Sequence, residues 1–211
     1  MNPSVIETYK KQYVDIGFER AELFKTIARR FACTDVLYPG CSTHITPSFF
    51  FPHVVYVDQS PAVAKFFADF EPIQSFVNRK KQYKRRAYIR FIAQDYTGSL
   101  DLQNESFDLL ISLYAGSVAQ ACKAYLKPGG LLLTNDHQNN VSEALNDGCF
   151  RLKSVGKHTK GGYRFFDEKL DTFLPSDRNK AKVKNYLKSS SRGAKYREDV
   201  EQYFLFEKRA C

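Results

Sequence analysis

A glycine and an aspartate at the ends of two short apolar segments give the strongest chemical signal in the sequence. Gly40 comes two residues after the segment 35–38, and Asp58 directly follows the segment 54–57. Because glycine lets the backbone turn sharply at the end of a parallel strand, a ligand can approach the main chain there. A carboxylate at the end of the next strand can accept hydrogen bonds from both hydroxyls of a ribose. This spacing predicts a site for an adenosine-containing cofactor; the alternative is a structural turn followed by a surface aspartate.

Short apolar runs separated by helical patterns must hold these two residues in place. Near-continuous apolar runs that alternate with helices are typical of a mostly parallel sheet covered on both faces. The turn Lys127-Pro-Gly-Gly130 closes one of the helical patterns and leads into the next run. The predicted strands of this central part are 35–38, 54–57, 87–93, 107–113 and 131–134, and the predicted helices are 62–69 and 115–125.

The length of 211 residues favours a single domain with additions on either side of this central part. Apolar residues at helical spacing predict one or two N-terminal helices, broken near Gly17, that form a lid or cap. A basic stretch late in the chain looks like an insertion with helical content between two further strands. The predicted divisions are 1–31 (lid or cap), 35–135 (cofactor-binding core) and 150–211 (strands 150–158 and 202–207, with the insertion at about 167–199).

Five short motifs, in this order and spacing, resemble those of a known enzyme family. They are Val36-Leu-Tyr-Pro-Gly-Cys41, Val55-Tyr-Val-Asp58, Ile92-Ala-Gln-Asp95, Phe107-Asp-Leu-Leu-Ile-Ser112 and Leu126-Lys-Pro-Gly-Gly-Leu-Leu-Leu133. Residues 35–135 and the last predicted strand thereby resemble the class I S-adenosylmethionine-dependent methyltransferases. The resemblance implies an α/β fold: a Rossmann-like three-layer sandwich with N-terminal helices. Its mostly parallel sheet would have seven strands, the last of them antiparallel.

The resemblance also implies that S-adenosylmethionine is the cofactor and gives a role to each matching residue. Gly40 and the loop after it would approach the amino-acid part of the cofactor, while Asp58 would hold the ribose hydroxyls. Asp95, with Tyr96 beside it, would meet the adenine, although Asp95 also suits a helix or turn cap. The residues assigned to cofactor binding in this way are Tyr38, Gly40, Cys41, Ser42, Asp58, Gln59, Asp95, Tyr96, Ser112 and Leu113.

The glycine loop departs from the family pattern. Such methyltransferases commonly have an acidic residue two places before the first glycine and glycines at alternate positions after it; here Tyr38, Ser42 and His44 stand there. Tyrosine cannot act as a carboxylate toward the cofactor's ammonium group, and a side chain at Ser42 fills space that glycine leaves open. Two hypotheses follow: an active methyltransferase, or a catalytically silent protein of this fold that binds nucleic acid or a protein. A nicotinamide-dependent oxidoreductase is disfavoured because the third glycine of its fingerprint would fall at Ile45.

Methyl transfer from a sulfonium requires few catalytic side chains. It is an in-line displacement that depends on alignment, and it needs a base only when the acceptor must lose a proton. The sequence therefore leaves the acceptor unassigned. His137 and Tyr114 are the candidate catalytic residues, and His44 is a further histidine near the glycine loop. Asp136 and His137 have no third clustered ligand, so no metal site is predicted.

The net charge of +9 is concentrated in two basic runs. Residues 79–90 contain seven basic and no acidic residues, and residues 177–200 contain eight basic and three acidic ones. Such runs are either solvated helix faces or a surface for a polyanion, so an anionic acceptor and nucleic acid are both candidate partners. The lack of a long apolar run or a signal peptide predicts a cytoplasmic protein with no membrane partner. Five cysteines without paired spacing predict free thiols.

Overall fold

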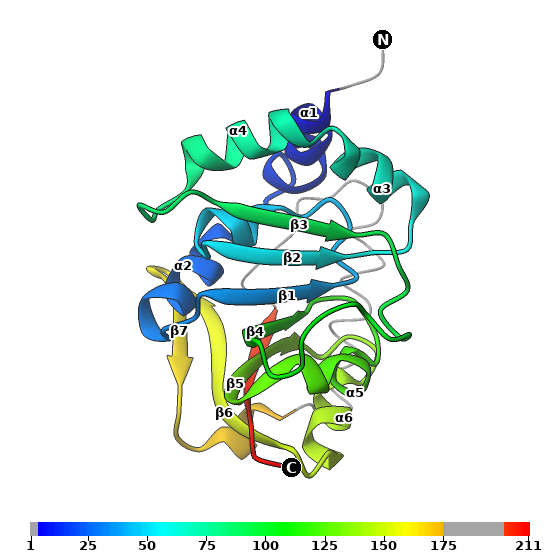
Figure 1. Cartoon of the computed structure of the whole chain (residues 1–211). Coiled ribbons are helices and arrows are strands. Elements are labelled where there is room, and N and C mark those ends of the chain that lie inside the picture. The colour runs from blue at the N-terminus through cyan, green and yellow to red at the C-terminus, as the bar shows by residue number, and fades with distance from the viewer. Residues whose placement is uncertain (1–3, 175–200) are drawn as a thin grey trace.

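The computed structural model describes residues 4–174 and 201–211, which form one twisted sheet with helices packed against it (Figure 1). The strands are β1 (Asp35–Pro39), β2 (His53–Val57), β3 (Tyr88–Ile92), β4 (Phe107–Ser112), β5 (Leu126–Asn135), β6 (Phe150–Thr159), β7 (Gly162–Phe166) and β8 (Gln202–Lys208). Their order across the sheet is β3-β2-β1-β4-β5-β8-β6-β7. Strands β1 to β5 pair in parallel, whereas β8 is antiparallel to both β5 and β6.

The helices cover both faces of this sheet. They are α1 (Val5–Tyr9), α2 (Ala21–Arg30), α3 (Pro61–Ala68), α4 (Phe70–Lys80), α5 (Val118–Cys122) and α6 (Asn140–Asn146), with a π-helix η1 (Lys10–Val14) and short 3-10 helices η2 (Thr46–Phe49), η3 (Lys123–Tyr125) and η4 (Leu170–Phe173). A capping box between Ser4 and Glu7 starts α1. Gly17, with φ of +70°, lies between the first helical segment and α2, where a break between two helices was predicted. The first four helices contribute to one buried apolar cluster, and α5 and α6 contribute to another.

These two clusters arise because successive side chains of a strand point to opposite faces of the sheet. In β1, Val36 and Tyr38 belong to the cluster beneath the N-terminal helices, whereas Leu37 between them belongs to the cluster beneath α5 and α6. Both faces are therefore apolar, as the continuous apolar runs in the sequence predicted. Strand order reverses between β1 and β4, and in open α/β sheets the carboxyl ends at such a point form a ligand crevice.

The structure confirms the α/β class and the mostly parallel sheet, but the sheet has eight strands instead of seven. The extra strand, β7, follows a tight turn at Lys160 and Gly161, begins at Gly162, where φ is +108°, and pairs with β6. Its buried residues Tyr163 and Phe165 pack beneath α2, and Phe165 lies edge-to-face with Phe31. Most of the predicted basic insertion at about 167–199 lies outside the described residues.

The prediction of free thiols is wrong for two of the five cysteines. Cys149 and Cys211 form a disulfide although they are 62 residues apart in sequence. The pairing of β6 with β8 brings these two segments together, since Phe150 lies opposite Lys208 in the ladder. Cys33, Cys41 and Cys122 are free. Within residues 4–174 and 201–211, no helix is long and apolar enough to cross a membrane.

Candidate functional site

The carboxyl ends of β1 and β2 bring Gly40 and Asp58 together, as their spacing in the sequence predicted. The Gly40 amide donates to the carbonyl of Val57 at 2.8 Å, and the Ser42 amide donates to Oδ2 of Asp58 at 2.9 Å. Gly40 has a φ of +62°, and a Cβ atom there would lie 2.6 Å from the Cβ of Ala115. Only glycine meets both conditions without strain, so the turn depends on it.

Asp58 holds two loops at this edge of the sheet. Its Oδ2 accepts from the Ser42 amide, and its Oδ1 accepts from the Ser60 amide at 2.9 Å, next to the start of α3. A carboxylate has about four acceptor positions, so each oxygen can accept a further hydrogen bond from a ligand hydroxyl. The side chain is half-buried, and its neighbour Gln59 is exposed.

Tyr96 lies across the same edge. Its Cε1 atom is 3.5 Å from the position that a Cβ of Gly40 would take, and its hydroxyl donates to the carbonyl of Gly116 at 2.9 Å. The ring therefore covers the glycine turn and joins the loop after β3 to the loop after β4. Asp95 beside it is exposed and accepts from the Thr97 amide at 2.9 Å, which lowers the pKa of its carboxyl. This bond makes Asp95 a turn cap, and its exposed carboxylate is charged.

The loop after β4 is fixed tightly against the glycine turn. Tyr114 and Ser117 both have positive φ values, +62° and +57°, which are uncommon for residues with side chains. The Ala115 carbonyl accepts from Nδ2 of Asn140 at 2.8 Å and from Oγ of Ser112 at 3.3 Å. Ser112 and Leu113 are themselves buried beneath this loop. Strained backbone that the surroundings hold in place is a common feature of binding sites.

Three residues around the glycine loop point into the core instead of toward the edge. Tyr38 is buried, and its hydroxyl lies 3.1 Å from Nδ1 of His44. His44 is 2% exposed, stacks on Tyr13 at 4.4 Å, and has its Nε2 3.0 Å from the carbonyl of Glu19. Burial raises the pKa of the Cys41 thiol well above its usual range, which suits a packing role. The acidic position of the family pattern is thus replaced by a buried tyrosine–histidine pair.

The buried histidine predicts a pH dependence of stability. Burial, with a smaller contribution from Arg20, lowers the pKa of His44 to about 3, whereas an unfolded histidine titrates near 6.5. The unfolded state therefore takes up the proton first, so stability is retained above about pH 6.5 and falls as the pH decreases. We expect the free energy of unfolding in urea to fall by about 2 kcal/mol between pH 7.5 and pH 5. His44→Gln should remove most of this difference, and an equal slope in the variant would contradict the assignment.

A buried polar cluster lies next to the loop after β4, and it had not been predicted. Arg20 is 1% exposed and Glu201 is 9% exposed, and Nη2 of Arg20 lies 3.2 Å from Oε2 of Glu201. The glutamate also accepts from the hydroxyls of Tyr114 and Tyr203 and from Nδ2 of Asn135 at 2.6 Å. The cluster therefore joins the N-terminal segment, the ends of β4 and β5, and the start of β8 through one carboxylate.

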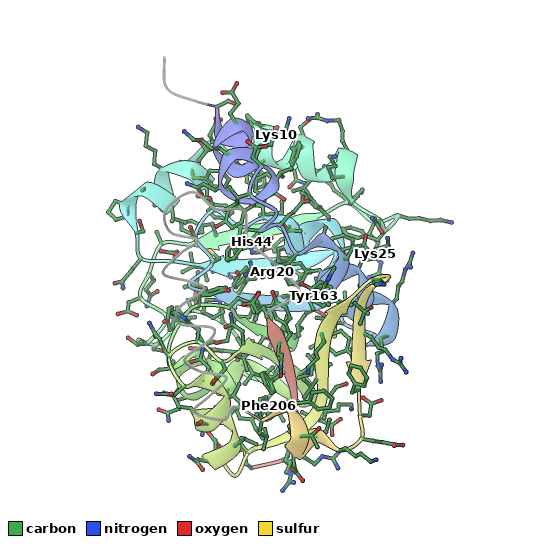
Figure 2. All side chains as sticks on the ribbon, turned by 180° about the vertical axis from the view of Figure 1, so that it is seen from behind. Lys10, Arg20, Lys25, His44, Tyr163 and Phe206 are labelled. Atoms are coloured by element: carbon green, nitrogen blue, oxygen red, sulfur yellow. A yellow bond between two sulfur atoms is a disulfide. The ribbon has the colours of Figure 1, made fainter. Side chains whose placement is uncertain are left out.

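Aromatic rings enclose the guanidinium group of this cluster. Its Cζ atom lies 3.6 Å from the ring centre of Phe18 and 5.1 Å from that of Tyr114, and Nε donates to the hydroxyl of Tyr203 at 2.6 Å. Figure 2 labels Arg20 and His44, and both are almost fully buried. Arg20 and Glu201 are 181 residues apart. No local pattern in the sequence marks this contact.

Of the two candidate catalytic residues, Tyr114 belongs to this cluster and His137 lies beside it. The ring of His137 is 5.0 Å from the ring of Tyr114, and burial lowers its pKa, which favours the neutral imidazole that a base requires. Burial and the charge of Glu201 raise the pKa of Tyr114, so its hydroxyl remains protonated and acts as a donor. Among the described residues, no three potential metal ligands cluster.

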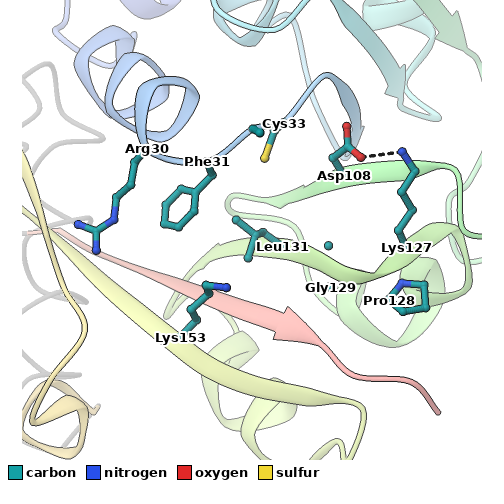
Figure 3. Close-up of a pocket in the computed structure, with 11 residues that line it drawn as sticks. Arg30, Phe31, Cys33, Asp108, Lys127, Pro128, Gly129, Leu131 and Lys153 are labelled. Atoms are coloured by element: carbon teal, nitrogen blue, oxygen red, sulfur yellow. Dashed lines mark hydrogen bonds and ion pairs between the residues drawn. The ribbon is translucent and has the colours of Figure 1, made fainter.

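The opposite edge of the sheet has a hollow of about 420 Å³ at the amino ends of β1, β4 and β5 (Figure 3). Burial raises the pKa of its Cys33 thiol to about 12, so the thiol is protonated. Each of the three lining cations already has a carboxylate partner: Lys127 with Asp108, Arg30 with Asp167 and Lys153 with Glu207. The described lining of the hollow therefore offers no unpaired cation and no thiolate, so the carboxyl edge of the sheet remains the candidate functional site.

Comparisons with known proteins bear on the fold. No protein-family model matches the sequence, and no curated protein sequence is significantly similar to it. An S-adenosylmethionine-dependent methyltransferase from Thermotoga maritima is similar in structure with a TM-score of 0.53 at 9% identity, covering 97% of this chain and 96% of that chain. A protein of Methanococcus maripaludis, described as such a methyltransferase, gives 0.51 at 14% identity, with 97% and 90% covered. The [4+2]-cyclase SpnF gives 0.52 at 14% identity, with 90% and 81% covered, so the fold is not confined to methyltransferases.

Proposed function

We propose that this chain, which has the fold of the class I S-adenosylmethionine-dependent methyltransferases, is itself such an enzyme. The observation that carries the proposal is the junction of Gly40 and Asp58 at the point where strand order reverses. A backbone turn without a side chain and a carboxylate that can accept further hydrogen bonds lie side by side there. This combination suits an adenosyl ligand laid across the carboxyl ends of the strands.

Each part of the edge would have a separate task in binding. Asp58 would accept hydrogen bonds from the ribose hydroxyls, and the exposed Asp95 would accept one from the adenine amino group, with Tyr96 against the ring. The loop at Cys41 and Ser42 would lie beside the amino-acid part of S-adenosylmethionine. When bound, this cofactor supplies a methyl group on a sulfonium, and the protein's task is to align an acceptor with it.

The acceptor would enter on the side of Tyr114 and His137. The Tyr114 hydroxyl already donates to Glu201, so it could contact an acceptor only by accepting a hydrogen bond, whereas a neutral His137 can take a proton from an acceptor that must lose one. The acceptor itself stays unassigned, because in-line transfer to oxygen, nitrogen or carbon makes similar demands on the protein.

Calorimetric titration tests the proposal most directly. We expect S-adenosylmethionine and S-adenosylhomocysteine to bind and NAD not to bind. A second candidate is a catalytically silent protein of this fold, and the buried Tyr38 and the Tyr96 ring over Gly40 favour it. Failure of both adenosyl ligands to bind would support that candidate over the enzyme.

The contact of Tyr96 with Gly116 predicts how the site opens. Because the ring covers the glycine turn, an adenosyl ligand must displace it and break its hydroxyl bond to the Gly116 carbonyl. Such a bond contributes roughly 0.5–1.5 kcal/mol, so Tyr96→Phe should strengthen S-adenosylhomocysteine binding by about two- to tenfold. Tyr96→Ala serves as the comparison, because it also removes the ring that would cover the adenine. Weaker binding by Tyr96→Phe would show that the hydroxyl contacts the ligand instead.

A further inference from the structure

A basic surface lies far from the carboxyl edge. It consists of the seven basic residues from Arg79 to Arg90, and we call it the basic edge because it leads from the end of α4 into β3, an edge strand of the sheet. Among the described residues, Arg90 alone of these seven has a carboxylate partner, Asp101 at 3.9 Å, and that partner is fully exposed. The basic edge therefore holds six cations in eight residues that have no carboxylate partner within the described part of the chain: Arg79, Lys80, Lys81, Lys84, Arg85 and Arg86.

Two other groups of cations among the described residues have carboxylate partners. Arg151 and Lys153 share Glu207, and Lys127 lies between Asp108 and Asp35. Like charges held close together repel one another, which disfavours the compact state unless an anion lies nearby. An external polyanion bound at the basic edge would relieve this repulsion.

The backbone of the basic edge is anchored at several points. The Gln82 amide donates to the Phe49 carbonyl at 2.8 Å, and the Tyr83 hydroxyl donates to the Ser48 carbonyl at 2.7 Å. Nε2 of Gln74 donates to the Ala87 carbonyl at 3.1 Å. These bonds fix the path of the chain between α4 and β3. Cations on a fixed backbone lose less conformational freedom on binding than cations on a loose loop.

An aromatic side chain stands at the end of the basic edge. Tyr88, the first residue of β3, is 51% exposed, although its ring is large enough to prefer burial. The ring packs edge-to-face on His53 at 4.4 Å, and Nδ1 of His53 is bonded to Asp35. A ring that is held on one side and open to solvent on the other offers a stacking surface.

We infer that the basic edge is a docking surface for single-stranded nucleic acid. Cations in a row can track a phosphate backbone, and a fixed aromatic ring can stack on an unpaired base. The arginines favour this partner further, because a guanidinium group binds phosphate with two parallel hydrogen bonds and stacks on bases. A membrane is a poorer match, since Tyr88 is the one large apolar side chain that the described residues expose in this segment. The inference goes beyond the proposed methyl transfer and does not depend on it.

Fluorescence anisotropy with the full chain and labelled 15-nucleotide oligouridylate and oligodeoxythymidylate tests this inference. If four phosphates are neutralised, the logarithm of the affinity falls with that of salt with a slope of roughly −2.8, so raising salt from 50 to 200 mM should weaken binding about 50-fold. The combined variant Lys84→Glu, Arg85→Glu, Arg86→Glu should weaken binding by more than about tenfold and reduce the salt slope. Tyr88→Ala should weaken binding about tenfold and leave the slope unchanged.

A charge-matched variant distinguishes an effect of the basic edge on binding from an effect of the net charge of the protein. Lys10→Glu, Lys65→Glu, Lys160→Glu alters three scattered, exposed lysines and gives the same change in net charge, from +9 to +3 (9 minus 6). We expect this control to bind within about threefold of the parent, and circular dichroism should show both variants folded. Equal losses in the two variants would overturn the inference, as would tighter binding to polyglutamate or to phosphatidylserine vesicles than to the oligonucleotides. No cofactor is present in these assays, so their outcome is independent of the test of methyl transfer.

Discussion

Replacing Glu201 with alanine is expected to lower the free energy of unfolding by about 3–5 kcal/mol, measured by urea denaturation. The substitution leaves the buried Arg20 without its ion-pair partner, and it removes the acceptor for Tyr114 and Asn135. An uncompensated charge in the interior has a large desolvation cost, which is the physical origin of the effect. In a chain of this size the loss corresponds to a fall in Tm of about 10 °C.

A surface ion pair provides the control for this experiment. Glu22 pairs with Lys25 at 3.0 Å but is 55% exposed, so Glu22→Gln should change stability by less than about 1 kcal/mol. The combination of Arg20→Met with Glu201→Gln should be more stable than the sum of the single changes predicts, by at least about 1 kcal/mol, because no charge is left unpaired. Strict additivity, or a loss from Glu201→Ala no greater than that of the control, would show that the pair is not coupled.

Asp58→Ala is expected to weaken S-adenosylmethionine binding by about 10- to 100-fold in calorimetric titration. A hydrogen bond to a charged group contributes roughly 1.5–3 kcal/mol, and the proposed ribose contact is of this kind. The change also frees the Ser42 and Ser60 amides, so the two loops that form the edge lose their shared anchor.

Two further variants test whether the charge of Asp58 itself accounts for the loss of affinity. Asp58→Asn keeps the size of the side chain and one strong acceptor but removes the charge, so it should fall between the parent and alanine. Asp101→Ala removes a fully exposed carboxylate that makes one long contact with Arg90, and cofactor affinity should stay unchanged. If Asp58→Ala leaves the affinity for S-adenosylmethionine unchanged, this carboxylate does not contact the cofactor and serves only to anchor the two loops.

The central strands could be predicted from the sequence because both faces of the sheet are buried. In β2 and β4 the apolar residues run almost without a break, and only a doubly covered strand allows this pattern. β7 was missed because Gly162-Tyr-Arg-Phe-Phe166 is short, and its burial depends on packing beneath α2. The disulfide was missed for a related reason, since only the pairing of β6 with β8 brings Cys149 near Cys211.

The site was predictable where local backbone chemistry decides it. The positive φ of Gly40 and the position of Asp58 after β2 follow from the strand–turn pattern around them. The orientation of Tyr38 did not follow, because a strand residue near a loop can face either the edge or the core, and here His44 binds it within the core. The Arg20–Glu201 pair could not be predicted from the sequence, because only the folded structure brings residues so far apart in the chain into contact.

The position of β8 has a consequence for how the protein is made. Of the strands that the structure describes, β8 comes last in sequence, yet it lies between β5 and β6, so it separates strands that are synthesised earlier. On the ribosome, β6 and β7 can form a local hairpin but have no neighbour to join until residues 202–208 emerge. The nascent chain must therefore keep the edge of β5 exposed until residues 202–208 have been translated, and unpaired strand edges favour aggregation during that period.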